Sequence, residues 1–506
     1  MFKDEHRDKV WNEIRQHDLR SFRRQLTPEL FAEAGTQAGV RLGGNALNWV
    51  NMVWLGIASA MHHAANFAFV LSSTMKLLED QEHFYATCLG KERKKAQRKR
   101  DKKGPRKRSK HDPHGQDPTQ VSEEAFAQAR QQMPLAFWMA LLTLLAARFQ
   151  QAHAQHLSFR GFRLLAMDGT AINLPNDPRL RAYYGAPKNG QRKRACPQAR
   201  MVMLTLPGTR IPIAYELSPV GNSELELAGR LMNHVRSNDL LLMDRGFVSY
   251  GWFWQIQQRG AYFGTRLKKN IKYKKLRRLG HNDWLVKWTP KDSRGQWKEL
   301  PRSIQLRVIR YQIPGFRSSA IVTNVLDPKR LSREDWVRLA IDCDDQGKLK
   351  PGLYHRRWEI ETSFAELKVT LRLESLRSRS PASLEYEVAG RLVYYLLVRW
   401  LIVQAAEKHG LDPLRISFTE AVRELEQMRA TLIASSQTWV ACVLLPRLLD
   451  RIASHTVPLR PGRHYSRPKD TKTKHHGRRK KRPASKLKKR NNSNPRNKQR
   501  KLARQA

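Results

Sequence analysis

The sequence has few cysteines and no segment typical of secretion. Its four cysteines, Cys88, Cys196, Cys343 and Cys442, are far apart in 506 residues and form no CxxC pair. This spacing does not indicate a zinc site, and isolated thiols fit a reducing cytosol. The N-terminus, MFKDEHRDKVW, is charged throughout and lacks the apolar segment of a secretory signal. We therefore expect a cytoplasmic protein.

Long, uninterrupted hydrophobic runs are also missing. The run Trp49–Leu71 contains three polar residues near its centre, His62, His63 and Asn66. A second run, Met133–Phe149, is shorter than the roughly 20 residues of a membrane-spanning helix. Both runs are predicted to be buried helices, so no membrane association is expected.

Acidic residues are scarce relative to basic ones. The chain has 94 Lys and Arg against 45 Asp and Glu, giving a formal net charge of +49 and a pI near 10.7. A charge of this sign attracts a polyanion, and nucleic acid is the usual one. A solubilising tail or a ribosome-bound accessory protein remains an alternative on charge alone.

Composition and periodicity divide the chain into eight segments. They are a helical N-terminal region (1–90), a basic disordered linker (91–121), a helical connector (122–157), a mixed α/β segment (158–267), a β-rich insertion (268–330), its helical continuation (331–380), a C-terminal helical region (381–457) and a basic disordered tail (458–506). The overall fold class is therefore α/β with helical ends.

The segment 158–267 shows the order β-β-β-α-β-α-β. The five strands are predicted at Phe162–Met167, Ala199–Leu206, Ile211–Leu217, Asp239–Met243 and Tyr262–Leu267. In a sheet of this order the first and fourth strands can lie side by side. That pairing would bring together Asp168 and Asp244, which follow these two strands.

Asp168 and Asp244 are candidate metal ligands. Each follows an apolar run and has a glycine within two positions, which predicts a sharp turn. A carboxylate at the end of a buried strand needs a partner, and hard oxygen ligands suit Mg²⁺. The alternative is a helix cap or a salt bridge, for example between Asp244 and Arg245.

A polar stripe is predicted on a helix over residues 350–371. Arg357, Glu361 and Lys368 follow Tyr354 at offsets of 3, 7 and 14, which places all four on one helical face. A solvated charged face would give a similar pattern.

The motif Tyr354-x2-Arg357-x3-Glu361-x6-Lys368 resembles the YREK signature of insertion-sequence family 4 transposases. Asp168-Gly-Thr and Asp244-Arg-Gly-Phe resemble its two upstream blocks, so the resemblance covers about residues 160–380. It implies an RNase H-like mixed sheet with flanking helices, interrupted by the β-rich insertion before the last catalytic helix.

The resemblance further implies a catalytic triad of Asp168, Asp244 and Glu361 that binds two Mg²⁺ ions, for which Mn²⁺ can substitute. Phosphate contacts are expected from Tyr354, Arg357, Lys368 and Arg245, and base stacking from Trp358. For a second stacking aromatic in the insertion, the alternatives are Trp284, Trp288, Trp297 and Phe316. The triad carboxylates are expected to converge to roughly 4–8 Å of one another.

The expected activity is cut-and-paste transposition with a hairpin intermediate, in the nucleoid of a prokaryote. The expected partners are double-stranded DNA, as terminal inverted repeats and target, and a second copy of the chain in a dimer on DNA. End recognition is assigned by analogy to the N-terminal helical region. Three alternatives stay open: a decayed or domesticated transposase that only binds DNA, a structural nucleic-acid-binding protein, and an RNase H-like junction resolvase.

Overall fold

The computed structural model describes a large part of the chain. The described residues are 22, 24–43, 47–62, 67, 70–71, 74, 121–154, 157–187, 196–290, 299–312, 318–338, 352–428, 431–432 and 439–458. The chain divides into two units, Met1–Val457 and Pro458–Ala506. The predicted basic linker, except for its last residue, and nearly all of the predicted basic tail lie outside the described residues, as do Trp297 and Phe316.

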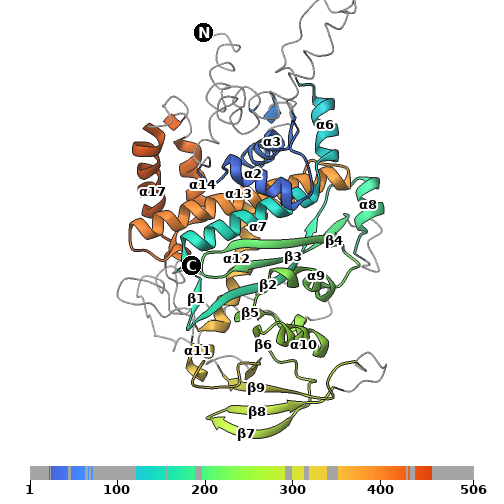
Figure 1. The fold of residues 1–506 in the computed structure, drawn as a ribbon, viewed down its shortest axis with the longest axis vertical. Coiled ribbons are helices and arrows are strands. Elements are labelled where there is room, and N and C mark those ends of the chain that lie inside the picture. Colours follow the sequence, from blue (N-terminus) through green and yellow to red (C-terminus); the bar gives the residue numbers. More distant parts are fainter. Residues whose placement is uncertain are drawn as a thin grey trace, which may run out of the picture. The chain divides into compact units, whose positions relative to one another are not determined.

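A single ten-stranded sheet forms the centre of the first unit (Figure 1). Its order is β4-β3-β2-β5-β6-β10-β9-β8-β7, and β1 pairs with β2. The strands are β1 (Ser158–Phe159), β2 (Phe162–Asn173), β3 (Gln198–Leu206), β4 (Ile211–Pro219), β5 (Asp239–Met243), β6 (Tyr262–Arg266), β7 (Lys274–Gly280), β8 (Asp283–Trp288), β9 (Ile304–Tyr311) and β10 (Ser319–Thr323).

Strands β2, β5 and β6 run parallel to one another, whereas β3 and β4 are antiparallel to their neighbours. Every residue of β5 is buried, because helices and neighbouring strands cover an apolar run of this kind on both faces. The predicted pairing of the first and fourth strands is confirmed, since Leu164 pairs with Leu240 and Met167 with Met243.

The prediction that this strand ends before Asp168 is wrong. Strand β2 continues to Asn173 and pairs with β3 from Ala166 onward. Gly169 therefore makes no sharp turn. A Cβ atom at Gly169 would lie 2.7 Å from the carboxyl carbon of Glu224, so glycine is required there by the close approach of a neighbouring side chain.

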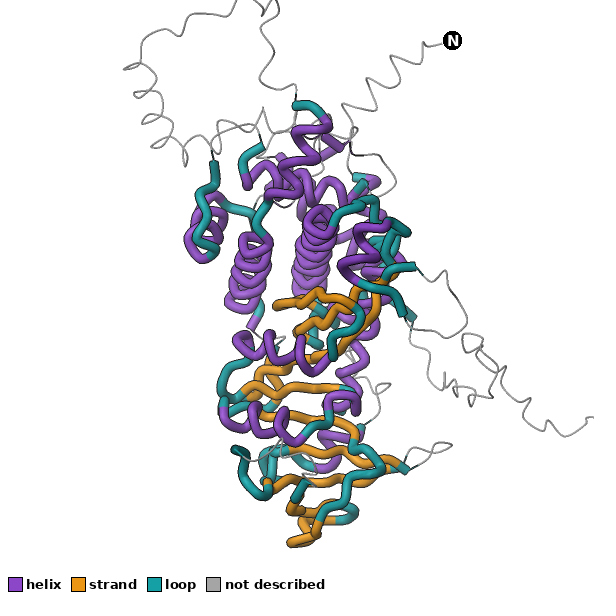
Figure 2. The backbone as a smooth tube through the Cα atoms, turned by 90° about the vertical axis from the view of Figure 1, so that its right-hand side faces the viewer, coloured by secondary structure: helices purple, strands orange, loops and turns teal. Residues whose placement is uncertain are grey.

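The insertion extends the core sheet. Strand β10 pairs antiparallel with β6, and β9, β8 and β7 follow, so Figure 2 shows the strands in one continuous stack. The predicted β-rich character is confirmed, although β7 was not predicted. A buried ion pair between Arg307 and Asp283 lies inside this part of the sheet.

The helices come from both ends of the chain and from the segments between the strands. They are α2 (Pro28–Gln37), α3 (Trp49–Met61), α6 (Glu123–Gln132), α7 (Leu135–Ala152), α8 (Pro178–Tyr184), α9 (Glu224–Arg230), α10 (Tyr250–Gln258), α11 (Arg333–Val337), α12 (Trp358–Ala365), α13 (Pro381–Lys408), α14 (Phe418–Gln427) and α17 (Leu445–Ser454). Short turns of 3₁₀-helix (η3, Leu231–His234; η4, Arg245–Phe247; η5, Leu353–Arg357; η7, Pro413–Arg415) and π-helix (η6, Glu366–Thr370; η8, Val440–Leu444) join them.

Two helices begin at side-chain N-caps. The Thr27 hydroxyl accepts a hydrogen bond from the Leu30 amide at the start of α2, with Pro28 in the first turn, and the Ser223 hydroxyl accepts one from the Glu226 amide. These caps satisfy amides that the helix itself leaves unpaired.

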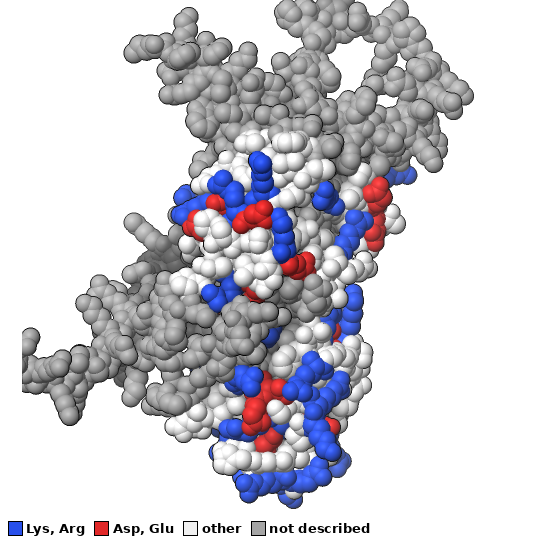
Figure 3. Space-filling model, turned by 90° about the vertical axis from the view of Figure 1, so that its left-hand side faces the viewer, with Lys and Arg blue, Asp and Glu red and all other residues white. Residues whose placement is uncertain are grey.

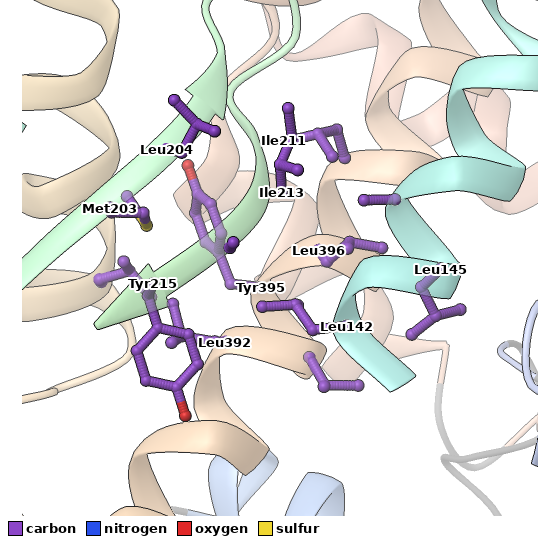
Figure 4. Close-up of a cluster of buried hydrophobic side chains, with 14 of the residues drawn as sticks. Leu142, Leu145, Met203, Leu204, Ile211, Ile213, Tyr215, Leu392, Tyr395 and Leu396 are labelled. Atoms are coloured by element: carbon purple, nitrogen blue, oxygen red, sulfur yellow. The ribbon is translucent and has the colours of Figure 1, made fainter. Parts of the chain in front are cut away.

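Helices α7 and α13 pack against each other and against β4. Figure 4 shows Leu142 and Leu145 of α7 and Leu396 of α13 facing the apolar side chains of the hairpin, among them Ile213 and Leu204. By length and composition alone, α7 and α13 could each cross a membrane; 44% and 94% of their apolar windows are buried inside the structure. Both therefore contribute to the hydrophobic core.

Candidate active site

Asp168 and Asp244 lie next to each other at the centre of the sheet. Met167 of β2 is paired with Met243 of β5, and each aspartate directly follows one of these methionines in the sequence. Asp168 remains within β2, whereas Asp244 is the first residue after β5 and caps the short helix η4. Parallel neighbouring strands thus bring the two carboxylates to one place.

Asp244 is held in a tight loop. Its Oδ1 accepts a hydrogen bond from the Gly246 amide at 2.5 Å, and its backbone carbonyl accepts one from the Thr265 hydroxyl at 2.7 Å. Arg245 is exposed and, within the described residues, forms no ion pair with Asp244. The alternative of an Asp244–Arg245 salt bridge is therefore not what the structure contains.

The segment that carries Tyr354, Arg357, Glu361 and Lys368 is not a uniform α-helix. Tyr354 and Arg357 lie in the 3₁₀-helix η5, Glu361 in α12 and Lys368 in the π-helix η6. The prediction of one α-helical stripe is wrong in this respect, because the three helix types turn by different amounts per residue. The part of the predicted helix before residue 352 lies outside the described residues.

Arg357 connects the helix to the sheet. Its guanidinium donates to Asp168 Oδ2 at 3.1 Å and to Glu361 Oε1 at 2.8 Å. Its Cζ atom lies 4.9 Å from the centre of the Trp358 ring and 5.9 Å from that of Tyr354. One side chain therefore contacts four of the residues singled out in the sequence.

Burial raises the pKa of Asp168 from 3.8 to about 7, although Arg357 and the Gly169 amide counteract it. The negative charges of Asp244 and Glu361 raise the pKa further, so all three carboxylates interact electrostatically. Burial also raises the pKa of Tyr354 to about 12, which keeps the phenol protonated and able to donate a hydrogen bond.

Lys368 does not contact the triad carboxylates. Its ammonium donates to the Ala171 carbonyl of β2 at 2.6 Å and pairs with Glu374 at 3.2 Å. Trp358 is 44% exposed, whereas Trp288 is buried against Tyr250 and Phe253.

Trp284 is half-buried, with the Lys275 ammonium 4.2 Å from its ring centre. Among the described residues, no group of three or more His, Cys, Asp or Glu side chains is already gathered closely enough to hold a metal ion. The guanidinium of Arg357, not open space, lies between Asp168 and Glu361.

An open cavity of about 450 Å³ lies beside Asp244, and two lysines that were not predicted as site residues line it. Besides Asp244, Arg245 and Gly246, its lining comprises Lys268, Lys269 and Asn270. The Lys268 ammonium donates to the Val248 carbonyl at 3.0 Å and so braces the loop after Asp244. The sequence signal for these cations was the run Lys268-Lys269-Asn270, which directly follows the predicted strand Tyr262–Leu267.

Comparison with known proteins gives consistent results. Residues 160–397 match the family described as Transposase DDE domain. The transposase InsG for insertion sequence element IS4 of Escherichia coli (strain K12) is 28% identical over 370 residues, covering 70% of this chain and 80% of that protein. The putative transposase InsZ of the same organism is 31% identical over 104 residues, covering 20% of this chain and 35% of that protein.

A cryo-EM structure of the piggyBac transposase synaptic complex with hairpin DNA matches 88% of this chain and 87% of its own at 12% identity, with a TM-score of only 0.36. The part of this chain that matches the Transposase DDE domain family, residues 160–397, contains Asp168, Asp244 and the complete Tyr-Arg-Glu-Lys segment. Residues 160–397 therefore form a DDE transposase domain, and similarity to an IS4-element transposase over 70% of the chain supports the resemblance to insertion-sequence family 4.

Proposed function

We propose that this transposase excises and inserts its element by metal-dependent cut-and-paste, with Asp168, Asp244 and Glu361 as the catalytic triad. The observation that carries the proposal is that the Arg357 guanidinium bonds both Asp168 Oδ2 and Glu361 Oε1, while Met167 and Met243, which precede Asp168 and Asp244, are paired across the sheet. Carboxylates gathered in this way repel one another when the guanidinium leaves, unless another cation replaces it. The core strand order β4-β3-β2-β5-β6 supports the RNase H-like topology expected from the resemblance.

The donor set fits divalent metal ions, since it consists of carboxylate oxygens, the ligands that Mg²⁺ prefers. Asp168, Asp244 and Glu361 would hold two Mg²⁺ ions, or Mn²⁺ in their place. When bound, such ions polarise the phosphodiester and lower the pKa of an attacking water or 3′-hydroxyl. The protein's own contribution is to orient the three carboxylates and to release Arg357 from them.

Released from Asp168 and Glu361, Arg357 is placed to bind a phosphate next to the reacting bond. Its planar guanidinium suits two phosphate oxygens at once. The protonated Tyr354 phenol would donate a hydrogen bond to the same region, and Arg245 lines the cavity beside Asp244. Lys368 would have to leave its bond to the Ala171 carbonyl in order to reach DNA.

A hairpin intermediate needs an aromatic surface for an unpaired base. Trp358 has the exposure for this role and lies beside Arg357 at the triad. Burial argues against Trp288, and Trp284 is partly covered by Lys275. We therefore assign base stacking to Trp358.

The exposed edge of the insertion fits the DNA backbone. Strand β7 carries Lys274, Lys275, Arg277 and Arg278, all exposed. The single acid of the hairpin β7–β8, Asp283, is buried and paired with Arg307. Figure 3 shows Lys and Arg gathered at this lower end of the molecule. We propose that terminal inverted repeats or target DNA contact this edge, in an assembly of two copies of the chain.

The test is cleavage of duplex DNA that carries the sequences flanking this gene, with Mg²⁺ or Mn²⁺ and with a chelator as control. We expect the natural protein to cleave and Glu361→Gln to bind DNA without cleaving. Cleavage that is unaffected by Glu361→Gln would reject the triad. Binding without cleavage by the natural protein would favour a decayed transposase.

A further inference from the structure

Arg210 lies in the turn between β3 and β4 and points at the helix that carries Glu361. Its guanidinium donates to Glu359 Oε2 from Nε at 2.7 Å and to Glu366 Oε1 from Nη1 at 2.8 Å. Its side chain is only 11% exposed. Burial lowers the pKa of Arg210, but Glu359 and Glu366 outweigh it and raise the pKa overall.

Glu366 is also held from the other side, by helix α13. The Tyr395 hydroxyl donates to Glu366 Oε2 at 2.7 Å, and Arg399 forms an ion pair with the same carboxylate. Arg399 and Arg210, helped by the hydrogen bond from Tyr395, keep the pKa of Glu366 low despite its burial, so the carboxylate stays charged. We call Arg210, Glu359, Glu366, Tyr395 and Arg399 the ionic clamp.

The two attachment points bracket Glu361. Glu359 lies in the first turn of α12, and Glu366 is the first residue of the π-helix η6. Seven residues separate them, or roughly 10 Å along a helix that rises 1.5 Å per residue. Two contacts at this spacing restrict both rotation and sliding of the helix, which one contact would not do.

The clamp also coincides with the change of helix type. The Leu371 amide donates to the Glu366 carbonyl at 3.1 Å, five residues back, so the π-helix begins at the clamped residue. Such turns are rare and are found mostly at functional sites. Beyond it, Lys368 reaches the Ala171 carbonyl, three residues after Asp168 on β2.

Stability alone does not explain the clamp. Arg210 has a φ of +61°, a left-handed conformation that costs energy in a residue other than glycine. Buried ion pairs lose much of their Coulomb attraction to desolvation. A strained turn with two desolvated ion pairs is a poor means of stabilising a fold, but a precise means of fixing a helix.

We infer that Arg210 is a positioning residue, which holds α12 so that the Glu361 carboxylate faces Asp168 and Asp244. This inference rests on the proposed function of the three carboxylates. Arg210 would touch neither DNA nor metal, and would act only through Glu359 and Glu366.

The test measures direct Mn²⁺ binding to the full chain without DNA. The electron paramagnetic resonance signal of free Mn²⁺ reports how much of the ion remains unbound. We expect Arg210→Met to weaken Mn²⁺ binding about 10- to 100-fold, as loss of groups that orient metal ligands typically does. The Mn²⁺ affinity of Arg210→Lys should lie between those of the natural protein and Arg210→Met, because one ammonium can keep one of the two contacts. The DNA affinity of both variants should remain that of the natural protein.

The matched control is Arg163→Met. Arg163 is similarly buried and donates to both oxygens of Asp239, at 2.7 and 2.5 Å, but contacts no residue of α12. It lies five residues before Asp168, roughly 16 Å along the strand. We expect a lower melting temperature and an unchanged Mn²⁺ affinity.

Unchanged Mn²⁺ binding by Arg210→Met, or an equal loss in Arg163→Met, would overturn the inference. If Arg210→Met does not fold, Arg210→Lys and Glu366→Gln decide it by the same measurement. Glu361→Gln separates the two proposals, because Mn²⁺ binding that survives this change would reject the catalytic triad itself. Loss in Glu361→Gln with no change in Arg210→Met would reject only the clamp.

Discussion

The guanidinium of Arg357 donates hydrogen bonds to Asp168 at 3.1 Å and to Glu361 at 2.8 Å. The residue assigned to phosphate binding thus neutralises two of the carboxylates assigned to metal binding. Both roles cannot be fulfilled at once in this arrangement. Metal binding therefore requires Arg357 to leave these carboxylates, and a DNA phosphate is a partner that it can take in exchange.

Replacing Arg357 by Gln tests this exchange. In chelator, loss of charged hydrogen bonds to Asp168 and Glu361 should lower the free energy of unfolding by about 1–3 kcal/mol. Added Mg²⁺ should raise the melting temperature more in Arg357→Gln than in the natural protein, since the carboxylates are then uncompensated. Equal Mg²⁺ effects in the two proteins would contradict the exchange.

The stability that Asp168 contributes to the metal-free protein should fall as pH rises from about 4 to about 7. The folded state raises the pKa of Asp168 from 3.8 to about 7, so it holds a proton that the unfolded chain has already lost. The resulting stabilisation is full below the lower pKa and is lost as pH rises through the upper one, with a slope of at most about 1.4 kcal/mol per pH unit.

Urea unfolding in chelator at pH 5 and pH 8 measures this effect. The reference is Asp168→Asn, which cannot titrate at this position and should show a smaller difference between the two pH values. The same pH dependence in both proteins would exclude Asp168 as its source.

The exposed edge strand β7 should contribute to DNA binding by neutralising phosphates. Replacing Lys274 and Arg277 by Gln should lower the slope of log affinity against log salt by about 0.9 for each phosphate that is no longer neutralised. The charge-matched control replaces Lys329 and Arg447, both exposed and outside β7. An equal change in the control would mean that only net charge matters.

Trp358→Ala should affect hairpin formation more than stability. The ring is 44% exposed, so its removal costs little packing. Loss of base stacking worth about 1–3 kcal/mol would slow hairpin formation roughly 5- to 150-fold. Trp358→Phe should restore much of the rate, measured on a nicked DNA end. A normal rate in Trp358→Ala would remove this residue from the stacking role.

Several features were predictable because they are encoded locally. The short apolar run of β5, buried along its whole length, indicated a central strand, and the strand order placed Asp168 beside Asp244. The spacing from Tyr354 to Lys368 is a property of the sequence itself. Neither conclusion required knowledge of contacts between distant segments.

Tertiary structure decided what depends on such contacts. Strand β2 continues past Asp168 because β3 pairs with it, and the insertion extends the sheet because β10 finds the edge of β6. Arg210 meets carboxylates that follow it by 149 and 156 residues, from a turn whose sequence indicates a hairpin but not these partners. Periodicity records which side of an element is buried, whereas the partner that buries it is selected only when the whole core packs.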